Sequence, residues 1–155
     1  MILPATVDLT DEAATARLGA VLAPALRTGE AICLSGPLGA GKSTLARALV
    51  RALTRPDEDV PSPTFTLVQT YDAPRFPLAH FDLYRLTDPD EAFEIGLDEA
   101  LDDGAALIEW PERLEGRLPP DRLDIDIGFD ETGEGRRARL TPHGAWEGRE
   151  LEFRA

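Results

Sequence analysis

The segment Gly36-Pro37-Leu38-Gly39-Ala40-Gly41-Lys42-Ser43 has the residue types and the spacing that hold phosphate groups. It matches G-x-x-x-x-G-K-[ST], the pattern of a phosphate-binding loop. Glycines at positions 36, 39 and 41 allow backbone turns that residues with a Cβ avoid, so that successive N–H groups point into one concavity. Lys42 can then reach the β- and γ-phosphates, and the Ser43 hydroxyl can ligate Mg²⁺. The segment therefore predicts a binding site for a nucleoside triphosphate.

The residues on either side supply the strand and the helix that such a loop needs. Ala31-Ile32-Cys33-Leu34 is an apolar run typical of a buried strand, and Leu45, Leu49 and Leu53 recur at helical spacing. A helix that starts near Lys42 directs the positive end of its dipole at the phosphates. This order of strand, loop and helix distinguishes the motif from a chance glycine-rich turn.

Two acidic residues follow apolar runs farther along the chain. Asp82 comes after Leu-Ala-His-Phe, and Glu109 comes after Ala-Leu-Ile. Ligands of parallel α/β sheets bind at the carboxyl ends of strands, so Ser35, Asp82 and Glu109 are expected around one site. A phosphate-binding loop needs a carboxylate there to position Mg²⁺ or its water. Both acids are therefore candidate metal ligands with Ser43, and the sequence does not decide which of the two meets the metal.

Other residues near these motifs each allow two interpretations. The alternative for the two acids is an ion pair with a basic residue such as Arg85 or Arg113. His80 is flanked by apolar residues, and such a histidine is more often packed in a core than catalytic. Thr64, in Pro-Ser-Pro-Thr-Phe, is either a switch hydroxyl that responds to the γ-phosphate or a residue at the start of a strand. Trp110 either packs in the core or lies beside the site, where it gates the loop or meets a partner.

The N-terminal part of the chain predicts a strand and a helix ahead of the phosphate loop. Residues 2–8 are expected to form a short strand. A helix follows, with Thr10 as its N-cap and two acidic residues in its first turn. Pro24 kinks or shortens this helix, and Gly29 is expected to end it.

The rest of the chain predicts more strands than helices. Early strands separated by helices indicate a mostly parallel α/β sheet, and a C-terminal antiparallel hairpin makes it mixed. We therefore predict a single P-loop NTPase domain of the α/β class over residues 1–155, with helices flanking the sheet. The expected elements are a strand within 60–71 that follows the prolines at 61 and 63, strands over 78–83, 105–110, 123–129, 136–141 and 150–154, a short helix over 88–94 and an acidic turn over 98–103.

Composition limits the partners and the setting. The chain has 29 acidic against 16 basic residues in 155, a formal charge of −13. Such a protein is not expected to bind a nucleic-acid backbone unaided, because that needs a basic surface. Cys33 is the only cysteine, so no intrachain disulfide forms and a reduced, cytoplasmic setting is expected. There is neither a signal-peptide pattern nor an apolar run long enough to span a membrane.

The choice of nucleotide rests on residue types that are missing. The sequence contains no asparagine, so the Asn-Lys-x-Asp motif that reads guanine in GTPases cannot occur, and ATP is favoured. Small P-loop kinases carry an arginine-bearing lid, and no insertion of that size lies between the predicted strands. The family resemblance described next, rather than these absences, favours a partner-dependent ATPase. A small-molecule kinase is the alternative, and a nucleotide-gated binding module in which turnover is incidental is a third possibility.

Six stretches together resemble one family. LTDEAAT, LSGPLGAGKST, SPTFTLV, HFDLYRL, LIEWPERL and LPPDRLDIDI occur in this order, as in the bacterial TsaE family, formerly called YjeE. The resemblance spans about residues 8–141. It implies a weak, Mg²⁺-dependent, cytoplasmic ATPase, a monomer when isolated, needed to form threonylcarbamoyladenosine in tRNA beside the anticodon. It also implies that the ATPase regulates the TsaB–TsaD heterodimer and meets tRNA only indirectly, through that complex.

The resemblance also implies roles for individual residues. Glu109 falls on the metal-site acid, Asp82 and Trp110 on positions needed for activity, and Thr64 in a switch-like loop. Ser43 stands where the family usually has Thr, an equivalent Mg²⁺ ligand, whereas Pro37 departs from the family, which usually has Asp there. Adenine is expected between the start of the first helix and the hairpin. The predicted catalytic residues are Lys42, Asp82, Glu109 and Thr64, the metal ligands Ser43, Glu109 and Asp82, and the nucleotide-binding residues Gly36, Leu38, Gly39, Ala40, Gly41, Lys42, Ser43, Thr44, Asp11, Glu12 and Arg136.

Overall fold

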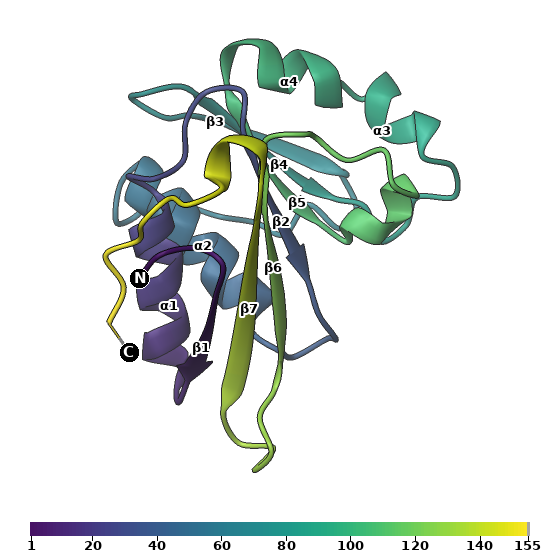
Figure 1. The fold of residues 1–155 in the computed structure, drawn as a ribbon. Helices are drawn as coiled ribbons and strands as arrows, with labels where there is room; N and C mark the ends of the chain where they lie inside the picture. Colours follow the sequence, from purple (N-terminus) through teal and green to yellow (C-terminus); the bar gives the residue numbers. More distant parts are fainter. Residues whose placement is uncertain (155) are drawn as a thin grey trace.

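The computed structural model describes residues 1–154 and has one seven-stranded sheet with helices on both faces (Figure 1). The α/β class predicted from the sequence is confirmed. The strands are β1 (Ala5–Leu9), β2 (Ala31–Ser35), β3 (Val68–Asp72), β4 (Pro77–Asp82), β5 (Ala105–Glu109), β6 (Arg122–Phe129) and β7 (Arg136–His143). The helices are α1 (Glu12–Leu22), α2 (Lys42–Leu53), α3 (Asp90–Glu94), α4 (Leu97–Asp103) and the 3₁₀ helices η1 (Pro111–Leu114) and η2 (Gly144–Trp146).

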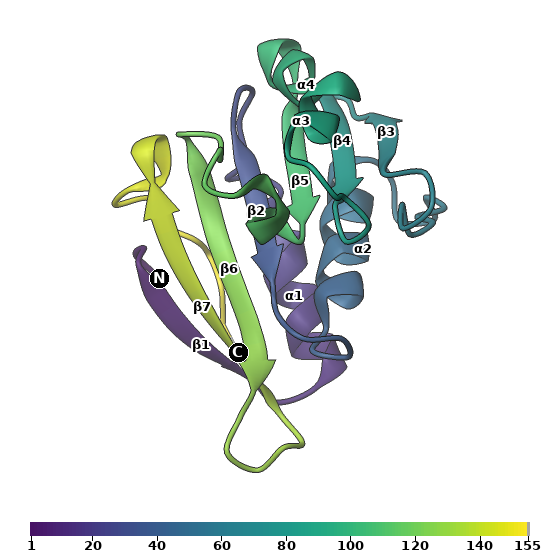
Figure 2. The same ribbon diagram turned by 90° about the vertical axis from the view of Figure 1, so that its right-hand side faces the viewer.

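The sheet is parallel in its centre and antiparallel at both edges. The strand order is β1-β7-β6-β2-β5-β4-β3 (Figure 2). β6, β2, β5 and β4 run parallel, whereas β7 and β1 add antiparallel at one edge and β3 at the other. The predicted C-terminal hairpin is β6–β7. The prediction of a mostly parallel sheet thus holds for the centre, and β3 adds an antiparallel edge opposite the hairpin.

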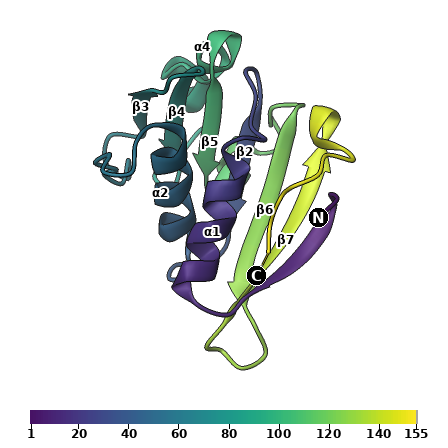
Figure 3. The same ribbon diagram turned by 90° about the vertical axis from the view of Figure 1, so that its left-hand side faces the viewer.

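Two apolar layers hold the sheet between its helices. α1 and α2 lie side by side on one face, where leucines and isoleucines of β2, β5 and β6 are buried against them (Figure 3). On the other face, residues of α3, α4 and η1 pack on β2, β4 and β5. Several residues of β6 and β7 that point to this second face are polar and exposed, for example Asp126 and Arg139. The central strands are therefore buried on both sides, which fits their nearly continuous apolar sequence.

The first helix begins and ends at residues that differ from the predicted ones. Its N-cap is Asp11, not Thr10, because the Asp11 carboxylate accepts a hydrogen bond of 2.8 Å from the Ala14 N–H. The helix ends at Leu22, since Pro24 has no N–H to continue the hydrogen-bond ladder. Pro24 thus shortens the helix, and Gly29 lies beyond it, in the turn before β2.

Three other segments also depart from the prediction. The strand expected after the prolines at 61 and 63 begins only at Val68, because residues 63–67 form a turn in which the Leu67 N–H donates to the Pro63 carbonyl at 2.7 Å. The acidic turn expected over 98–103 is helix α4. Residues 150–154 form no strand, because their pairing is limited to a bridge between Ile2 and Glu150 and the backbone bonds of Leu151 with Met1.

Candidate nucleotide-binding site

The glycine-rich loop joins β2 to α2 at the carboxyl end of the central strands. Gly36 has φ +145°, and a Cβ there would lie 2.2 Å from the Ile127 carbonyl oxygen, so a larger residue would push the loop off β6. Gly41 caps α2 with φ +108°, a conformation that favours glycine. The Ala40 N–H donates to the Pro37 carbonyl at 3.2 Å, which closes the turn between them. The loop therefore has the tight backbone path expected of a phosphate cradle.

Leu38 and Ala40 contribute to this loop through their backbone. The Leu38 side chain is 75% exposed, whereas the Ala40 methyl is buried in the core below the loop. Ser43 and Thr44 follow in the first turn of α2 and line the same hollow as the loop. The Thr44 hydroxyl donates to the Glu12 carboxylate at 3.4 Å, while Ser43 is exposed to the hollow.

Lys42 is a buried cation with spare hydrogen-bonding capacity. Its ammonium donates to the Gly36 carbonyl at 2.6 Å, which is its only hydrogen bond to any residue that the structure describes. The same nitrogen lies 3.8 Å from the centroid of the Trp110 ring, a cation–π contact. Burial lowers the pKa of Lys42 below its ordinary value, and the charges of Glu109, Glu112 and Asp82 partly oppose that shift. An ammonium has three donors, so two can be directed at phosphate oxygens.

Asp82 and Glu109 face this lysine from the ends of two adjacent strands. β4 and β5 are parallel, and Asp82 and Glu109 are opposite each other in their register, so both lie at the carboxyl ends of strands, where the sequence predicted them (Figure 2). Together with the loop they line a cavity of about 280 Å³. Its lining residues are Leu38, Gly39, Gly41, Lys42, Ser43, Thr44, Ser62, Thr64, Asp82, Glu109 and Trp110.

Neither Asp82 nor Glu109 forms an ion pair with Arg85 or Arg113, which was the alternative to a metal site. Asp82 accepts from the Thr64 hydroxyl at 3.1 Å and from the Tyr84 N–H at 3.0 Å. Glu109 accepts from His80 at 2.7 Å. Of the two arginines, Arg85 lies over the Phe65 ring and Arg113 over the Tyr84 ring. Both carboxylates therefore remain directed at the cavity.

The structure distinguishes between the two interpretations given for each of His80, Thr64 and Trp110. His80 is buried, as favoured from the sequence, and it also contacts Glu109. Thr64 precedes β3 in the loop that covers the cavity, so it does not start a strand. Trp110 follows β5 with a positive φ of +59° and lines the cavity next to Lys42. A positive φ is uncommon for an aromatic residue and marks a position held by its surroundings.

Sequence reasoning did not identify two side chains at the rim. The Tyr84 ring lies 4.9 Å from Trp110, and its position two residues after Asp82 in HFDLYRL was an available signal. The Ser62 hydroxyl lies 2.7 Å from that of Thr64. Since Ser62 lies in a proline-rich loop without periodicity, no local pattern indicated this contact.

A second cavity, of about 260 Å³, adjoins the loop on its other side. Asp11, Glu12 and Arg136, from the start of α1 and from β7, line it together with Gly39, so the three residues expected around adenine do lie together. The Asp11 carboxylate is engaged as the cap of α1. Arg136 donates to the Gly39 carbonyl at 3.1 Å and lies over the Phe129 ring. The hairpin is thereby fixed against the loop, and a nucleotide could occupy both cavities.

The residues around the first cavity fit a magnesium–nucleotide complex. Mg²⁺ prefers oxygen ligands and usually keeps several waters while it binds one or two protein groups plus phosphates. Ser43, Asp82 and Glu109 supply one hydroxyl and two carboxylates, and Lys42 supplies a cation for the phosphates. Sulfur and imidazole donors are missing among the residues that line this cavity, as expected for a hard cation.

A known protein family matches most of the chain. The family model described as "Threonylcarbamoyl adenosine biosynthesis protein TsaE" matches residues 9–138. The chain belongs to the TsaE family. Members of this family take part in tRNA threonylcarbamoyladenosine biosynthesis, and the resemblance noted in the sequence is confirmed.

Relatives of this chain match most of its length. Proteins named "tRNA threonylcarbamoyladenosine biosynthesis protein TsaE" are 39% identical in Bacillus subtilis (81% of this chain, 78% of the relative), 38% in Nostoc sp. (88% and 85%) and 38% in Rickettsia conorii (87% and 77%). The crystal structure of YdiB from Bacillus subtilis superposes with a TM-score of 0.73 at 28% identity, over 93% of this chain and 88% of that one. Separately, no helix within residues 1–154 has the length and apolarity needed to cross a membrane.

Proposed function

We propose that this TsaE-family protein is a weak, Mg²⁺-dependent ATPase required to form threonylcarbamoyladenosine in tRNA beside the anticodon. The observation that carries the proposal is the convergence of Lys42, Ser43, Asp82 and Glu109 on one cavity of about 280 Å³. A cation, a hydroxyl and two carboxylates beside a glycine-rich loop are the groups that phosphoryl transfer needs. The family's role in tRNA modification supports the biological assignment.

Each side chain then has a defined task. The backbone of Gly36–Ser43 holds the phosphates, and Lys42 moves from the Gly36 carbonyl to the β- and γ-oxygens. Ser43 and Glu109 would hold Mg²⁺, which when bound would neutralise charge that develops on the phosphates. Asp82 orients the attacking water, and Thr64, bonded to Asp82, links that task to the covering loop.

A kinase is less well supported than an ATPase. Small-molecule kinases need arginines over the transferred phosphate, and none of the described residues that line the cavity is an arginine. If the protein is a kinase, ATP consumption should increase in proportion to a small acceptor in the absence of any protein partner.

We propose that the protein acts in the cytoplasm through a partner complex, the TsaB–TsaD heterodimer. The net charge of −13 disfavours direct tRNA binding, so tRNA would be held by the partner while the isolated chain remains a monomer. Exposed apolar side chains at the cavity rim, Leu38 (75%), Phe65 (80%) and Tyr84 (45%), provide a surface for protein contact. Arg85 and Arg113 lie over two of these rings, and Arg and Tyr are common at the centres of interfaces.

We propose that ATP controls this surface. Thr64 ties the loop over 61–66 to Asp82, so a γ-phosphate in the cavity would rearrange the loop and the Asp82–Arg85 segment together. To shift such an equilibrium decisively, the partner must prefer the ATP form by at least ~100-fold, or about 2.7 kcal/mol.

The test is to titrate the protein against TsaB–TsaD with ADP and with a non-hydrolysable ATP analogue. We expect tighter binding with the analogue by ~100-fold or more. Equal affinities in the two nucleotide states would rule out the switch. Binding of tRNA by the isolated chain, measured in parallel, would contradict the argument from charge.

A further inference from the structure

His80 and Glu109 form a buried hydrogen-bonded pair behind the predicted metal site. Along β4, Leu78, His80 and Asp82 alternate with residues that face the other side of the sheet. In the parallel register, His80 is opposite Leu107 and Asp82 is opposite Glu109. The His80 side chain therefore reaches Glu109 from a position two residues before Asp82 in β4, rather than from the position directly opposite Glu109.

The chemistry of the two groups decides the direction of the bond. Nε2 of His80 lies 2.7 Å from Oε2 of Glu109, and the two side chains are 3% and 9% exposed. An ionised carboxylate only accepts hydrogen bonds, so Nε2 carries the hydrogen and donates it. A short bond of this kind in a dry setting holds both groups more firmly than it would in water.

The bond occupies one carboxylate oxygen and leaves the other for the site. Oε2 of Glu109 is engaged by His80, whereas Oε1 has no hydrogen bond to the residues described by the structure. Glu109 lines the 280 Å³ cavity and also a small cavity of about 70 Å³ that it shares with His80, Ser43 and Ser62. His80 thus contacts the carboxylate without itself lining the nucleotide cavity.

We infer that His80 is a positioning residue that fixes the Glu109 carboxylate for Mg²⁺ binding beside Ser43. This inference rests on the proposed function. Carboxylates that ligate metals are commonly oriented by a second hydrogen bond, and losing such a partner typically lowers metal affinity about 10–100-fold. A histidine that is merely packed in the core would have no effect on metal affinity when replaced by an apolar residue of similar size.

The experiment compares variants that keep or remove the donor at the Nε2 position. His80→Gln places an amide N–H near that position, His80→Leu fills the space without a donor, and His80→Asn is polar but too short to reach Glu109. The matched control is Phe81→Leu, because Phe81 is buried in the same strand but faces the opposite side of the sheet. Each variant is titrated with Mg²⁺ in the presence of a fluorescent ATP analogue, and thermal unfolding is recorded.

The Mg²⁺ concentration for half-maximal binding should increase by ~10-fold or more in His80→Leu and His80→Asn. It should stay within about threefold of wild type in His80→Gln and in Phe81→Leu, and analogue binding in EDTA should be the same in all variants. His80→Asn decides the question if His80→Leu fails to fold.

The positioning role would be overturned if His80→Leu or His80→Asn had the same Mg²⁺ dependence as wild type. It would also be overturned if the Mg²⁺ concentration for half-maximal binding increased as much in His80→Gln as in those two variants. These outcomes would leave the proposed function intact, provided that wild type binds the analogue in a Mg²⁺-dependent manner. Failure of the wild-type protein to bind the analogue with Mg²⁺ would overturn the proposed function and this inference together.

Discussion

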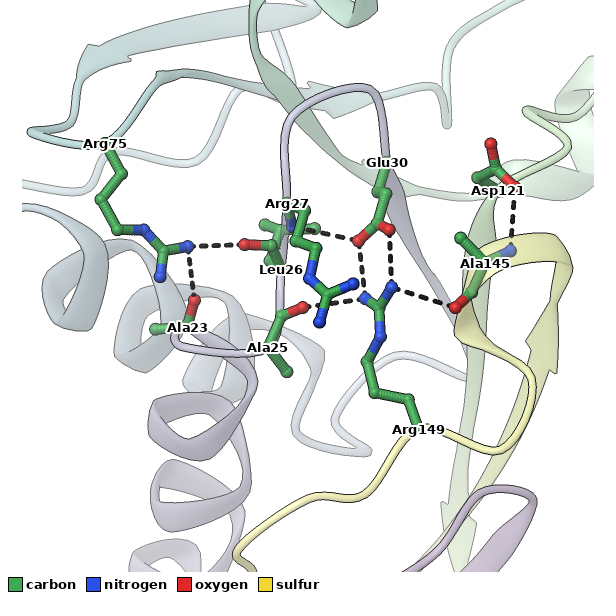
Figure 4. A network of polar contacts seen from close by, with 9 residues as sticks. All are labelled: Ala23, Ala25, Leu26, Arg27, Glu30, Arg75, Asp121, Ala145 and Arg149. Carbon is green, nitrogen blue, oxygen red and sulfur yellow. Dashed lines mark hydrogen bonds and ion pairs between the residues drawn. The ribbon is translucent and has the colours of Figure 1, made fainter.

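The two ends of the central sheet both bury charged side chains, but they satisfy them differently. At the end where β2 begins, Glu30 and Arg149 form a two-pronged ion pair with distances of 2.7 and 2.8 Å (Figure 4). Arg149 also donates to the carbonyls of Ala25 and Ala145, and Glu30 accepts from the Arg27 N–H. Both side chains are over 90% buried, and their charges are fully partnered within the protein.

At the other end, where β2, β4 and β5 finish, the buried charges are only partly satisfied. Lys42 has one hydrogen bond, to a carbonyl of its own loop, and no ion pair within residues 1–154. Asp82 and Glu109 are held by a hydroxyl, a backbone N–H and an imidazole, which leaves acceptor capacity on the cavity side.

The difference separates a structural cluster from a binding site. A closed network of charges has no capacity for a ligand, and its role is to join segments, here the C-terminal stretch and the turn before β2. A partly satisfied network is costly to keep in a folded protein, unless a ligand completes it. We therefore expect substitutions at the first end to change stability and substitutions at the second to change nucleotide chemistry.

The largest effect is expected from Arg149→Ala. Removing one partner leaves Glu30 buried and uncompensated, which should lower the free energy of unfolding by about 3–5 kcal/mol. Urea denaturation followed by circular dichroism measures this. The matched control is Arg75→Ala, which removes an exposed arginine that donates to the carbonyls of Ala23 and Leu26, and it should cost no more than about 2 kcal/mol.

Replacing both charged partners sharpens this prediction. Glu30→Met combined with Arg149→Met leaves no unpaired charge and should be more stable than Arg149→Ala by at least about 1 kcal/mol. If Arg149→Ala is no more destabilising than Arg75→Ala, the pair is not the structural cluster described here.

Lys42→Ala should have the opposite profile. ATP turnover should fall ~100-fold or more, because about 3 kcal/mol of transition-state stabilisation is lost with the charge at the β- and γ-oxygens. The free energy of unfolding should change by less than about 1 kcal/mol, since Lys42 makes a single hydrogen bond and burial already disfavours its charge. The control is Arg51→Ala, which removes the same charge from the exposed side of α2 and should turn over ATP normally. Turnover within threefold of wild type in Lys42→Ala would contradict the assignment of the site.

The smallest expected effects are those that distinguish the role of Glu109 from the role of Asp82. Glu109→Ala should raise the Mg²⁺ concentration needed for nucleotide binding by about tenfold, because a metal ligand is lost. Asp82→Ala should leave that concentration unchanged and reduce hydrolysis, since its proposed task is to orient water. Mg²⁺ titrations of nucleotide binding, combined with turnover rates, separate the two. Superimposable titrations for wild type and both variants would show that the acids do not divide these roles.

The sequence alone was sufficient to predict the phosphate loop, its strand and its helix, and to place Asp82 and Glu109 at strand ends around them. These features depend on local patterns: fixed glycine and lysine spacing, apolar runs, and helical periodicity. Local signals were weaker at element boundaries. Thr10 and Asp11 are both good caps, and only the geometry of the Ala14 N–H decided between them.

The tertiary structure decided which distant residues meet. Glu30 and Arg149 are 119 positions apart, Gly39 and Arg136 are 97 apart, and His80 and Glu109 are 29 apart. No periodicity within a segment encodes such pairs, because they follow from strand order, register and the way in which the chain ends return to the sheet. The antiparallel edge strand β3 and the failure of residues 150–154 to form a strand have the same cause, since strand pairing depends on which neighbour the fold brings alongside. Thus the sequence determined the kind of chemistry at the site, and the tertiary structure determined which side chains hold its acids in place.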